Sequence, residues 1–290
     1  MSTNGSGMMS QENGCVQNAA VAELPARPAS LSSISLRGVQ FAAVSRQECI
    51  DHLLDELAAS RGGTVVTLNV DHLRRCETDP QFRAIVEKAE MKVADGMPLV
   101  WASRLQRTPL PQRVAGSDLI DSLTGAAAEQ HRSIYLLGGN PGTAEAAAKL
   151  LAIRYPQLRI AGWHCPPPGF EKDPQSYAAT IDLVRSAAAD IVYVALGSPK
   201  QEQFIQSARA SLPNTWWLGV GISFSFLCGD VHRAPQWMQR TGLEWVHRLV
   251  QEPRRLFQRY ITQGLPFAAK LLVGATFNGM FQKGRADRVS

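Results

Sequence analysis

The sequence predicts an α/β protein with a mainly parallel, Rossmann-like sheet, helices on both faces and a basic helical appendage at the C-terminus. Short apolar runs rich in β-branched residues alternate with helical segments of about ten or more residues, and such connections join parallel strands. Strand-like runs then stop near Gly229, where an arginine- and tryptophan-rich helical stretch begins. At 290 residues and 45% hydrophobic content, the chain can form a sizeable core.

The first half of the chain predicts three strands and four helices. The strands are expected at residues 34–41, 64–68 and 91–94, and the helices at 46–59, 70–76, 80–88 and 116–130. The helix at 46–59 is indicated by the apolar spacing of Ile50, Leu53 and Leu57. The strand at 64–68 is indicated by its β-branched residues.

The second half alternates regularly between strand and helix. Strands are expected at residues 133–137, 158–163, 191–196 and 216–220, and helices at 143–154, 175–188 and 199–210. Right-handed crossovers would make these strands parallel. A helical stretch follows at 243–261, with Pro253 as a break or a new start, and an apolar stretch at 264–281 that is too short and interrupted to span a bilayer.

Composition divides the chain into a tail at 1–33, a Rossmann-like domain at 34–230 and a basic appendage at 231–290. The tail is rich in Ser, Gly, Asn, Gln and Ala without a continuous apolar run, so we expect disorder and no secretory signal. The appendage has ten basic and three acidic side chains, a net +7 against +5 for the whole chain. This indicates an anionic partner: phosphate, nucleic acid or acidic lipid.

The helical wheel of residues 243–261 favours the lipid surface among these partners. Apolar side chains fall on one side, opposite Arg248, Arg255 and Arg259, and another apolar stretch follows directly. A solvated helix face packed on the domain is the structural alternative. Nucleic acid is disfavoured because no base-stacking platform or reader motif is recognisable.

Several absent motifs exclude classes of site. The five cysteines are scattered without a C-x-x-C pair, and the six histidines show no H-E-x-x-H spacing. These patterns indicate a reducing compartment and no zinc site. No D-x-D pair occurs to hold Mg²⁺ or Mn²⁺, so the sequence predicts neither a metal nor a cofactor, and arginines must neutralise any phosphate.

The ends of the predicted strands carry a compact set of polar residues and glycines, where open α/β sheets bind their ligands. These ends are residues 67–69, 95–96, 138–143, 197–202 and 219–221. Asp95 is the strongest candidate for a catalytic residue. It acts either as a proton acceptor or as a cap for the segment near Pro98. Thr67 and Asn69 either bind sugar hydroxyls or cap a turn. Gly138 and Gly139 open either a phosphate-binding turn or an ordinary one that lacks the G-x-G-x-x-G pattern.

Together these segments resemble the WecG/TagA/CpsF glycosyltransferases over about residues 34–260. The motifs are T-L-N-V-D at 67–71, A-D-G-M-P-L-V at 94–100, R-V-A-G-S-D-L at 113–119, Y-L-L-G-G at 135–139, G-S-P-K-Q-E at 197–202 and the long R-A-P-Q-W-M…P-R-R-L run at 233–256. The resemblance implies an inverting, metal-independent transfer of a sugar from a UDP donor to a polyprenyl-diphosphate-linked saccharide.

Matching positions imply the roles of individual residues. Asp95 would be the general base, with Thr67 and Asn69 beside it in the acceptor pocket, and Arg113 and Gln201 would contact substrate. The C-terminal arginines would close over the diphosphate and dock the enzyme on the inner face of the bacterial membrane. The arginines concerned are Arg233, Arg248, Arg254, Arg255 and Arg259.

Two departures from the family pattern concern Ala94, where the family usually has proline, and the segment 219–229. In that segment Ser225 stands where the family commonly has an acidic residue. With this serine the segment resembles that of the GumM-type exopolysaccharide glucosyltransferases. It therefore indicates UDP-glucose as the donor, with UDP-N-acetylmannosamine or its uronic acid as the other candidates. The alternatives are an NAD-dependent oxidoreductase and a non-catalytic membrane-docking protein, and a homo-oligomer is compatible with the sequence.

Overall fold

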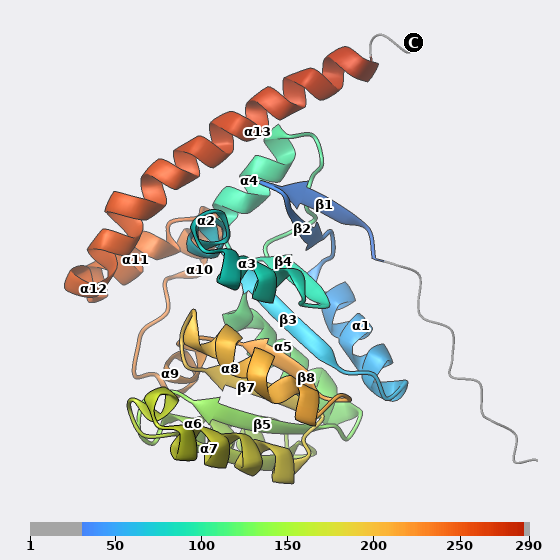
Figure 1. The fold of residues 1–290 in the computed structure, drawn as a ribbon, viewed down its shortest axis with the longest axis vertical. Coiled ribbons are helices and arrows are strands. Elements are labelled where there is room, and N and C mark those ends of the chain that lie inside the picture. The colour runs from blue at the N-terminus through green and yellow to red at the C-terminus, as the bar shows by residue number, and fades with distance from the viewer. Residues whose placement is uncertain (1–30, 287–290) are drawn as a thin grey trace, which may run out of the picture.

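The computed structural model describes residues 31–286, with side chains to residue 281. Its centre is a six-stranded sheet in the order β4-β3-β8-β7-β5-β6, in which every neighbouring pair is parallel (Figure 1). The strands are β3 (Gly63–Leu68), β4 (Met91–Ala94), β5 (Ser133–Gly138), β6 (Arg159–His164), β7 (Ile191–Ala195) and β8 (Trp216–Gly219). The predicted fold class is confirmed, whereas the predicted tail falls largely outside the described residues.

Helices connect consecutive strands, and several of them begin at capping residues visible in the sequence. Ser45 and Glu48 form a capping box at the first helix, and Asp79 and Asp173 each cap a helix whose first residue is proline. The helices are α1 (Arg46–Ala58), α2 (Val70–Thr78), α3 (Pro80–Glu87), α4 (Met97–Leu105), α5 (Gly116–Glu129), α6 (Thr143–Arg154), α7 (Pro174–Ala187) and α8 (Lys200–Ala208), with short 3₁₀ turns at Phe170–Lys172 and Arg209–Ser211.

Side chains alternate between the two faces of the sheet, so each strand contributes to two cores. Leu136 and Leu218 pack with α1, α5 and α6 on one face, whereas Leu137 and Trp217 pack with α7 and α8 on the other. The end of the sheet formed by β3 and β4 has a separate cluster with α2, α3 and α4. Helices on both faces leave the strand ends as the place for a ligand.

The N-terminal segment differs from the prediction of one strand at residues 34–41, which was wrong. It forms an antiparallel hairpin of β1 (Ser33–Leu36) and β2 (Val39–Ala42). Arg37 and Gly38 make the turn with φ values of 53° and 75°. Two consecutive positive φ angles match the type of turn that follows the twist of a hairpin, and only Gly38 marked it in the sequence.

The basic stretch at 243–261 is not one continuous helix: a new helix starts at Pro253, one of the two alternatives given for that residue, and the single apolar face predicted by the wheel was wrong. Glu252 leaves the helical conformation (φ −131°, ψ 60°), and Pro253 starts a new helix. Val250 and Phe257 are therefore exposed, whereas Leu256 is buried. The elements are α9 (Ser223–Cys228), α10 (Gln236–Arg240), α11 (Glu244–Gln251), α12 (Pro253–Phe257), a π-helical segment at Gln258–Gly264 and α13 (Leu265–Ala286).

Helix α13 lies along α4 at one end of the molecule and is longer than the predicted stretch at 264–281 (Figure 1). Phe267, Leu271 and Ala275 share a buried cluster with the β1–β2 hairpin and α4, as expected for a core-docked helix. The other side of α13 exposes Val273, Phe277, Met280 and Phe281. Within residues 31–286 no helix is long and apolar enough to cross a membrane.

Candidate active site

A cavity of about 720 Å³ lies at the carboxyl ends of all six parallel strands. Each strand or the turn after it supplies part of the wall: Thr67, Asp95, Gly139, Cys165, Leu196 and Val220. Residues of α11, α12, the π-helical segment and α13 line the opposite side. The C-terminal helices therefore complete the cavity that the sheet begins.

Asp95 follows β4 directly and contributes to the cavity wall. Its backbone N–H donates a 2.7 Å hydrogen bond to the Leu68 carbonyl, which fixes the residue between β3 and β4. Gly96 is the N-cap of α4, and no side chain caps that helix, so the capping alternative for Asp95 is not realised. Among residues 31–286, the carboxylate has no hydrogen bond and no ion pair.

Burial raises the pKa of Asp95 to about 6. The positive charge of Arg113 opposes this increase, the negative charges of Glu244 and Asp118 add to it, and Arg233 opposes it. The group is still ionised at neutral pH, and its pKa is close enough to neutrality for it to take up a proton during a reaction.

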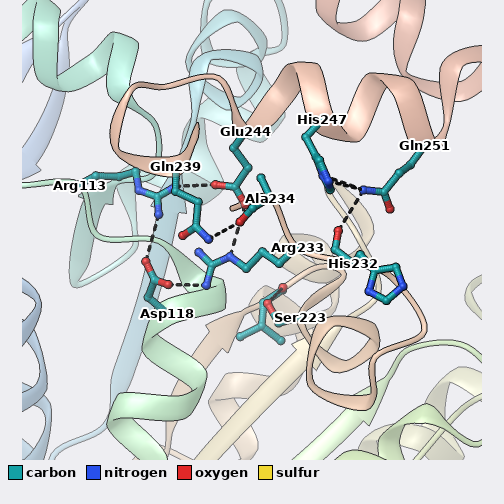
Figure 2. Close-up of polar contacts among 11 residues, drawn as sticks. Arg113, Asp118, Ser223, His232, Arg233, Ala234, Gln239, Glu244, His247 and Gln251 are labelled. Carbon is teal, nitrogen blue, oxygen red and sulfur yellow. Dashed lines mark hydrogen bonds and ion pairs between the residues drawn. The ribbon is translucent and has the colours of Figure 1, made fainter. Parts of the chain in front are cut away.

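Arg113, Asp118, Arg233 and Glu244 form a ring of four alternating charges (Figure 2). All four charges act on Asp95. Arg113 donates from Nη1 to Glu244 at 2.7 Å and from Nη2 to Asp118 at 3.1 Å. Arg233 donates from Nη1 to the other oxygen of Asp118 at 2.5 Å, and its Nε lies 3.4 Å from Glu244. The ring joins the loop before α5, the start of α5, the segment before α10 and the start of α11.

Thr67 and Asn69 lie at the end of β3 and both line the cavity. Asn69 caps α2, because its Oδ1 accepts hydrogen bonds from the N–H groups of Asp71 and His72. His72 Nδ1 in turn accepts from the Asn69 N–H at 3.1 Å, which places the proton of a neutral ring on Nε2. The predicted capping role of Asn69 is confirmed, and sugar binding by Thr67 and Asn69 stays a prediction.

Gln201 connects two strand ends beneath the cavity. Its Oε1 accepts a 3.1 Å hydrogen bond from the Gly221 N–H, and its Nε2 donates at 2.8 Å to Glu202. Glu202 is buried, and one of its oxygens lies 3.9 Å from His72 Nε2. Gln201 lines the cavity. The oxygen and the nitrogen of its amide both already form hydrogen bonds within the protein.

The two glycines after β5 have different surroundings. A Cβ on Gly138 would lie 2.7 Å from the Ala195 carbonyl oxygen, and one on Gly139 would lie 2.3 Å from Thr143 Oγ1. Both also have positive φ angles, so both are required by the packing of the turn. Gly139 lines the cavity and Gly138 does not.

The predicted C-terminal arginines separate into three groups. Arg248, Arg255 and Arg259 line the cavity. Arg259 forms an ion pair with buried Asp71 at 3.2 Å, Arg255 is paired with Glu252, and the buried Arg248 Nε has no partner among the described residues. The structure does not bring Arg233 or Arg254 to the cavity wall, because Arg233 belongs to the charge ring and Arg254 is exposed.

Two parts of the site were missed in the sequence. The turn after β6 contributes residues 165–171 to the cavity. Its P-P-P-G run was the available signal, because it directly follows the strand predicted at 158–163. Asp118 and Glu244 also escaped notice, although each lies in a motif quoted above. Their contacts with Arg113 are tertiary, and no local pattern marks them.

We predict that Asp95→Asn stabilises the protein above pH 6. The pKa of Asp95 is about 6 in the folded protein against an ordinary 3.8, so wild-type stability falls as the pH rises between these values. The variant should gain roughly 1–2 kcal/mol of unfolding free energy at pH 8 and nothing at pH 3.5. Urea denaturation measures this, and Asp182→Asn at an exposed ion pair should change stability equally little at both pH values. An equal or lower stability of Asp95→Asn at pH 8 would contradict the prediction.

The glycosyl transferase WecG/TagA/CpsF family model matches residues 34–279. The match includes the sheet, every strand end that lines the cavity and most of the C-terminal helices. It therefore confirms the resemblance carried by the sequence motifs. The chain belongs to the WecG/TagA/CpsF family and is a glycosyltransferase of cell-surface polysaccharide synthesis that uses a sugar donor and a sugar acceptor.

Proposed function

We propose that the protein is an inverting, metal-independent hexosyltransferase that moves a sugar from a UDP donor to a polyprenyl-diphosphate-linked saccharide. The observation that carries the proposal is the Asp95 carboxylate, which lines the cavity without a partner among the described residues and has a pKa of about 6. Family membership favours this function over an NAD-dependent oxidoreductase or a non-catalytic docking protein.

The chemistry is a single displacement. An acceptor hydroxyl oxygen attacks the anomeric carbon of the donor and loses its proton to Asp95. The bond from that carbon to the UDP oxygen breaks, and UDP departs with the bonding electrons. One carboxylate is sufficient, because inversion needs no covalent enzyme intermediate.

Arginines from the C-terminal helices supply the positive charge for the departing diphosphate. Arg248, Arg255 and Arg259 face the cavity from α11, α12 and the π-helical segment. Arg248 lines the cavity and forms no ion pair with a described carboxylate, so its guanidinium can bind a phosphate oxygen without giving up such a pair. The sequence has no D-x-D pair to hold a metal ion, which supports the assignment of this positive charge to the arginines.

The donor is UDP-glucose on this proposal, with UDP-N-acetylmannosamine and its uronic acid as the other candidates. Ser225 is buried on α9 and lines the cavity at the position where the family commonly has an acidic residue. A serine hydroxyl both donates and accepts hydrogen bonds, which suits an uncharged sugar hydroxyl.

We further propose that α13 docks the enzyme at the inner face of the bacterial cell membrane. Its exposed Val273, Phe277, Met280 and Phe281 form an apolar surface, and the region carries the excess of basic residues. Apolar contact combined with attraction to acidic lipid is the usual basis of interfacial binding. Docking there would bring the cavity to a lipid-linked acceptor used in exopolysaccharide synthesis.

We predict that Asp95→Asn lowers the rate of sugar transfer by ~10²–10⁴-fold, because the general base is lost. The variant should keep nearly wild-type affinity for UDP, measured by calorimetry, since the amide has the size of the carboxylate. Transfer is measured as radiolabel moved from UDP-glucose to a short-chain prenyl-diphosphate saccharide in the presence of EDTA.

Two outcomes would overturn this assignment. Transfer by Asp95→Asn near the wild-type rate would remove Asp95 from the role of base. A wild-type rate that collapses in EDTA and returns with Mg²⁺ or Mn²⁺ would contradict the metal-independent mechanism.

We expect Arg248→Gln to lower kcat/KM by ~10²-fold, because a positively charged donor to the leaving group is lost. Arg254→Gln is the matched control, six residues further along and exposed to solvent, and should change kcat/KM by less than about threefold. Steady-state kinetics with UDP-glucose compare the two. Equal effects of both variants would count against a role of Arg248 in the cavity.

We expect Phe281→Glu to weaken binding to vesicles that contain acidic phospholipid, because it places a charge in the apolar surface of α13. Ile153→Glu is the matched control, since Phe281 on α13 and Ile153 on α6 are both 77% exposed. Vesicle co-sedimentation measures the bound fraction. If Phe281→Glu and Ile153→Glu sediment alike, α13 is not the docking surface.

A further inference from the structure

Arg113 and Asp95 are held side by side by the backbone. The N–H of Val114, the residue after Arg113, donates a 2.8 Å hydrogen bond to the carbonyl of Ala94, the residue before Asp95. The two opposite charges are therefore neighbours. The guanidinium nevertheless forms ion pairs with Asp118 and Glu244, and no described ion pair joins it to Asp95.

The ring engages both terminal nitrogens of Arg113, so neither is free to form an ion pair with Asp95. Both terminal nitrogens of its guanidinium have a carboxylate partner, one from α5 and one from α11. Arg233 binds the second oxygen of Asp118 and lies near the second oxygen of Glu244, so both carboxylates are held in place (Figure 2). The four side chains are between 13% and 24% exposed, which strengthens these interactions relative to surface pairs.

We propose that Glu244 and Asp118 are positioning residues that hold the Arg113 guanidinium away from Asp95 and so leave the Asp95 carboxylate able to accept a proton. The inference rests on the proposed role of Asp95 as general base. Neither carboxylate needs to touch the reacting atoms. Each acts through Arg113, and Glu244 does so only while α11 is docked on the sheet.

Removing Glu244 would leave Arg113 with Asp118 and a free Nη1. Asp95, which the Val114–Ala94 hydrogen bond holds beside Arg113 and which has no described partner, would then be available to that nitrogen. An ion pair with an arginine lowers the pKa of an aspartate by about 1–3 units. Asp95 would become a weaker base and would also be blocked sterically. The largest charge effects on Asp95 come from Arg113, Glu244, Asp118 and Arg233, which are the four members of the ring.

The first test is the pH dependence of kcat/KM for sugar transfer. Wild-type enzyme should lose activity below about pH 6, whereas Glu244→Gln and Asp118→Asn should shift this acid limb downward by about one pH unit or more and lower the plateau. Glu87→Gln removes one carboxylate from an exposed ion pair with Arg83 and should leave the limb in place. If kcat falls in both ring variants while the acid limb of the kcat/KM profile stays at the wild-type pH, the proposal is overturned.

The second test does not need activity and separates reorientation of Arg113 from the loss of the negative charge of Glu244. Carbon-13 NMR of the aspartate carboxyls gives the pKa of Asp95, with its signal assigned through Asp95→Asn. Glu244→Gln should lower that pKa more in the wild-type background than in Arg113→Gln, where no guanidinium can turn. Equal shifts in the two backgrounds would contradict the proposal.

The two proposals can fail separately. Full transfer by Asp95→Asn would refute the general base, even if the unequal NMR shifts showed that the ring directs Arg113. Conversely, an inactive Asp95→Asn together with equal shifts in the two backgrounds would leave the base in place and refute the positioning role.

Discussion

The site depends on one constraint: a carboxylate must remain unpaired next to an arginine. Asp95 lies within the range of the Arg113 charge, and an ion pair between them would stabilise the folded protein at the expense of the base. The structure satisfies Arg113 elsewhere, through Asp118 and Glu244. Asp95 is left partly buried and has no counter-ion among the described residues. Functional sites often contain charged groups in such unfavourable surroundings.

The same constraint gives the C-terminal helices a structural part in the site. Glu244 and Arg233 lie beyond the last strand, yet they close the ring around a loop and helix of the sheet domain. Helix α13 secures this arrangement from the other end, because Phe267 and Leu271 are buried with the hairpin and α4. Composition predicted a boundary at residue 230, yet the segments on its two sides are in extensive contact. That this boundary separates two folding units stays a prediction.

The sheet and its helices were predictable because their signals are local. The strand and helix limits predicted between residues 46 and 220 agree with the structure to within two residues, since periodicity, capping residues and prolines lie within each element. Helix α4 was not predicted, and no side chain caps its start. The hairpin turn was missed, and the sequence left open whether Pro253 breaks a helix or starts a new one. An Arg-Gly turn lacks the usual turn signal, and a proline permits either a break or a new helix.

The candidate site was predictable in outline, because strand ends of a parallel sheet meet at one edge. Thr67, Asn69, Asp95, Gly139 and Gln201 were brought together on this argument, and all line the cavity. The argument indicates which residues meet but not which of them pair. It therefore identified Asp95, and the family resemblance added Arg113, but neither revealed that Asp118 and Glu244 bind Arg113.

Arginines in this chain show why pairing matters more than residue type. The sequence treats Arg233, Arg248 and Arg254 alike, as members of one basic run. In the structure Arg233 is bound by two carboxylates, Arg248 has a buried Nε without a described partner, and Arg254 faces solvent. A guanidinium held by carboxylates organises the protein, and one that lines the cavity without an ion pair among the described residues is available for an anionic ligand. Charge count alone indicates an anionic partner, whereas the distribution of carboxylates decides which arginine meets it.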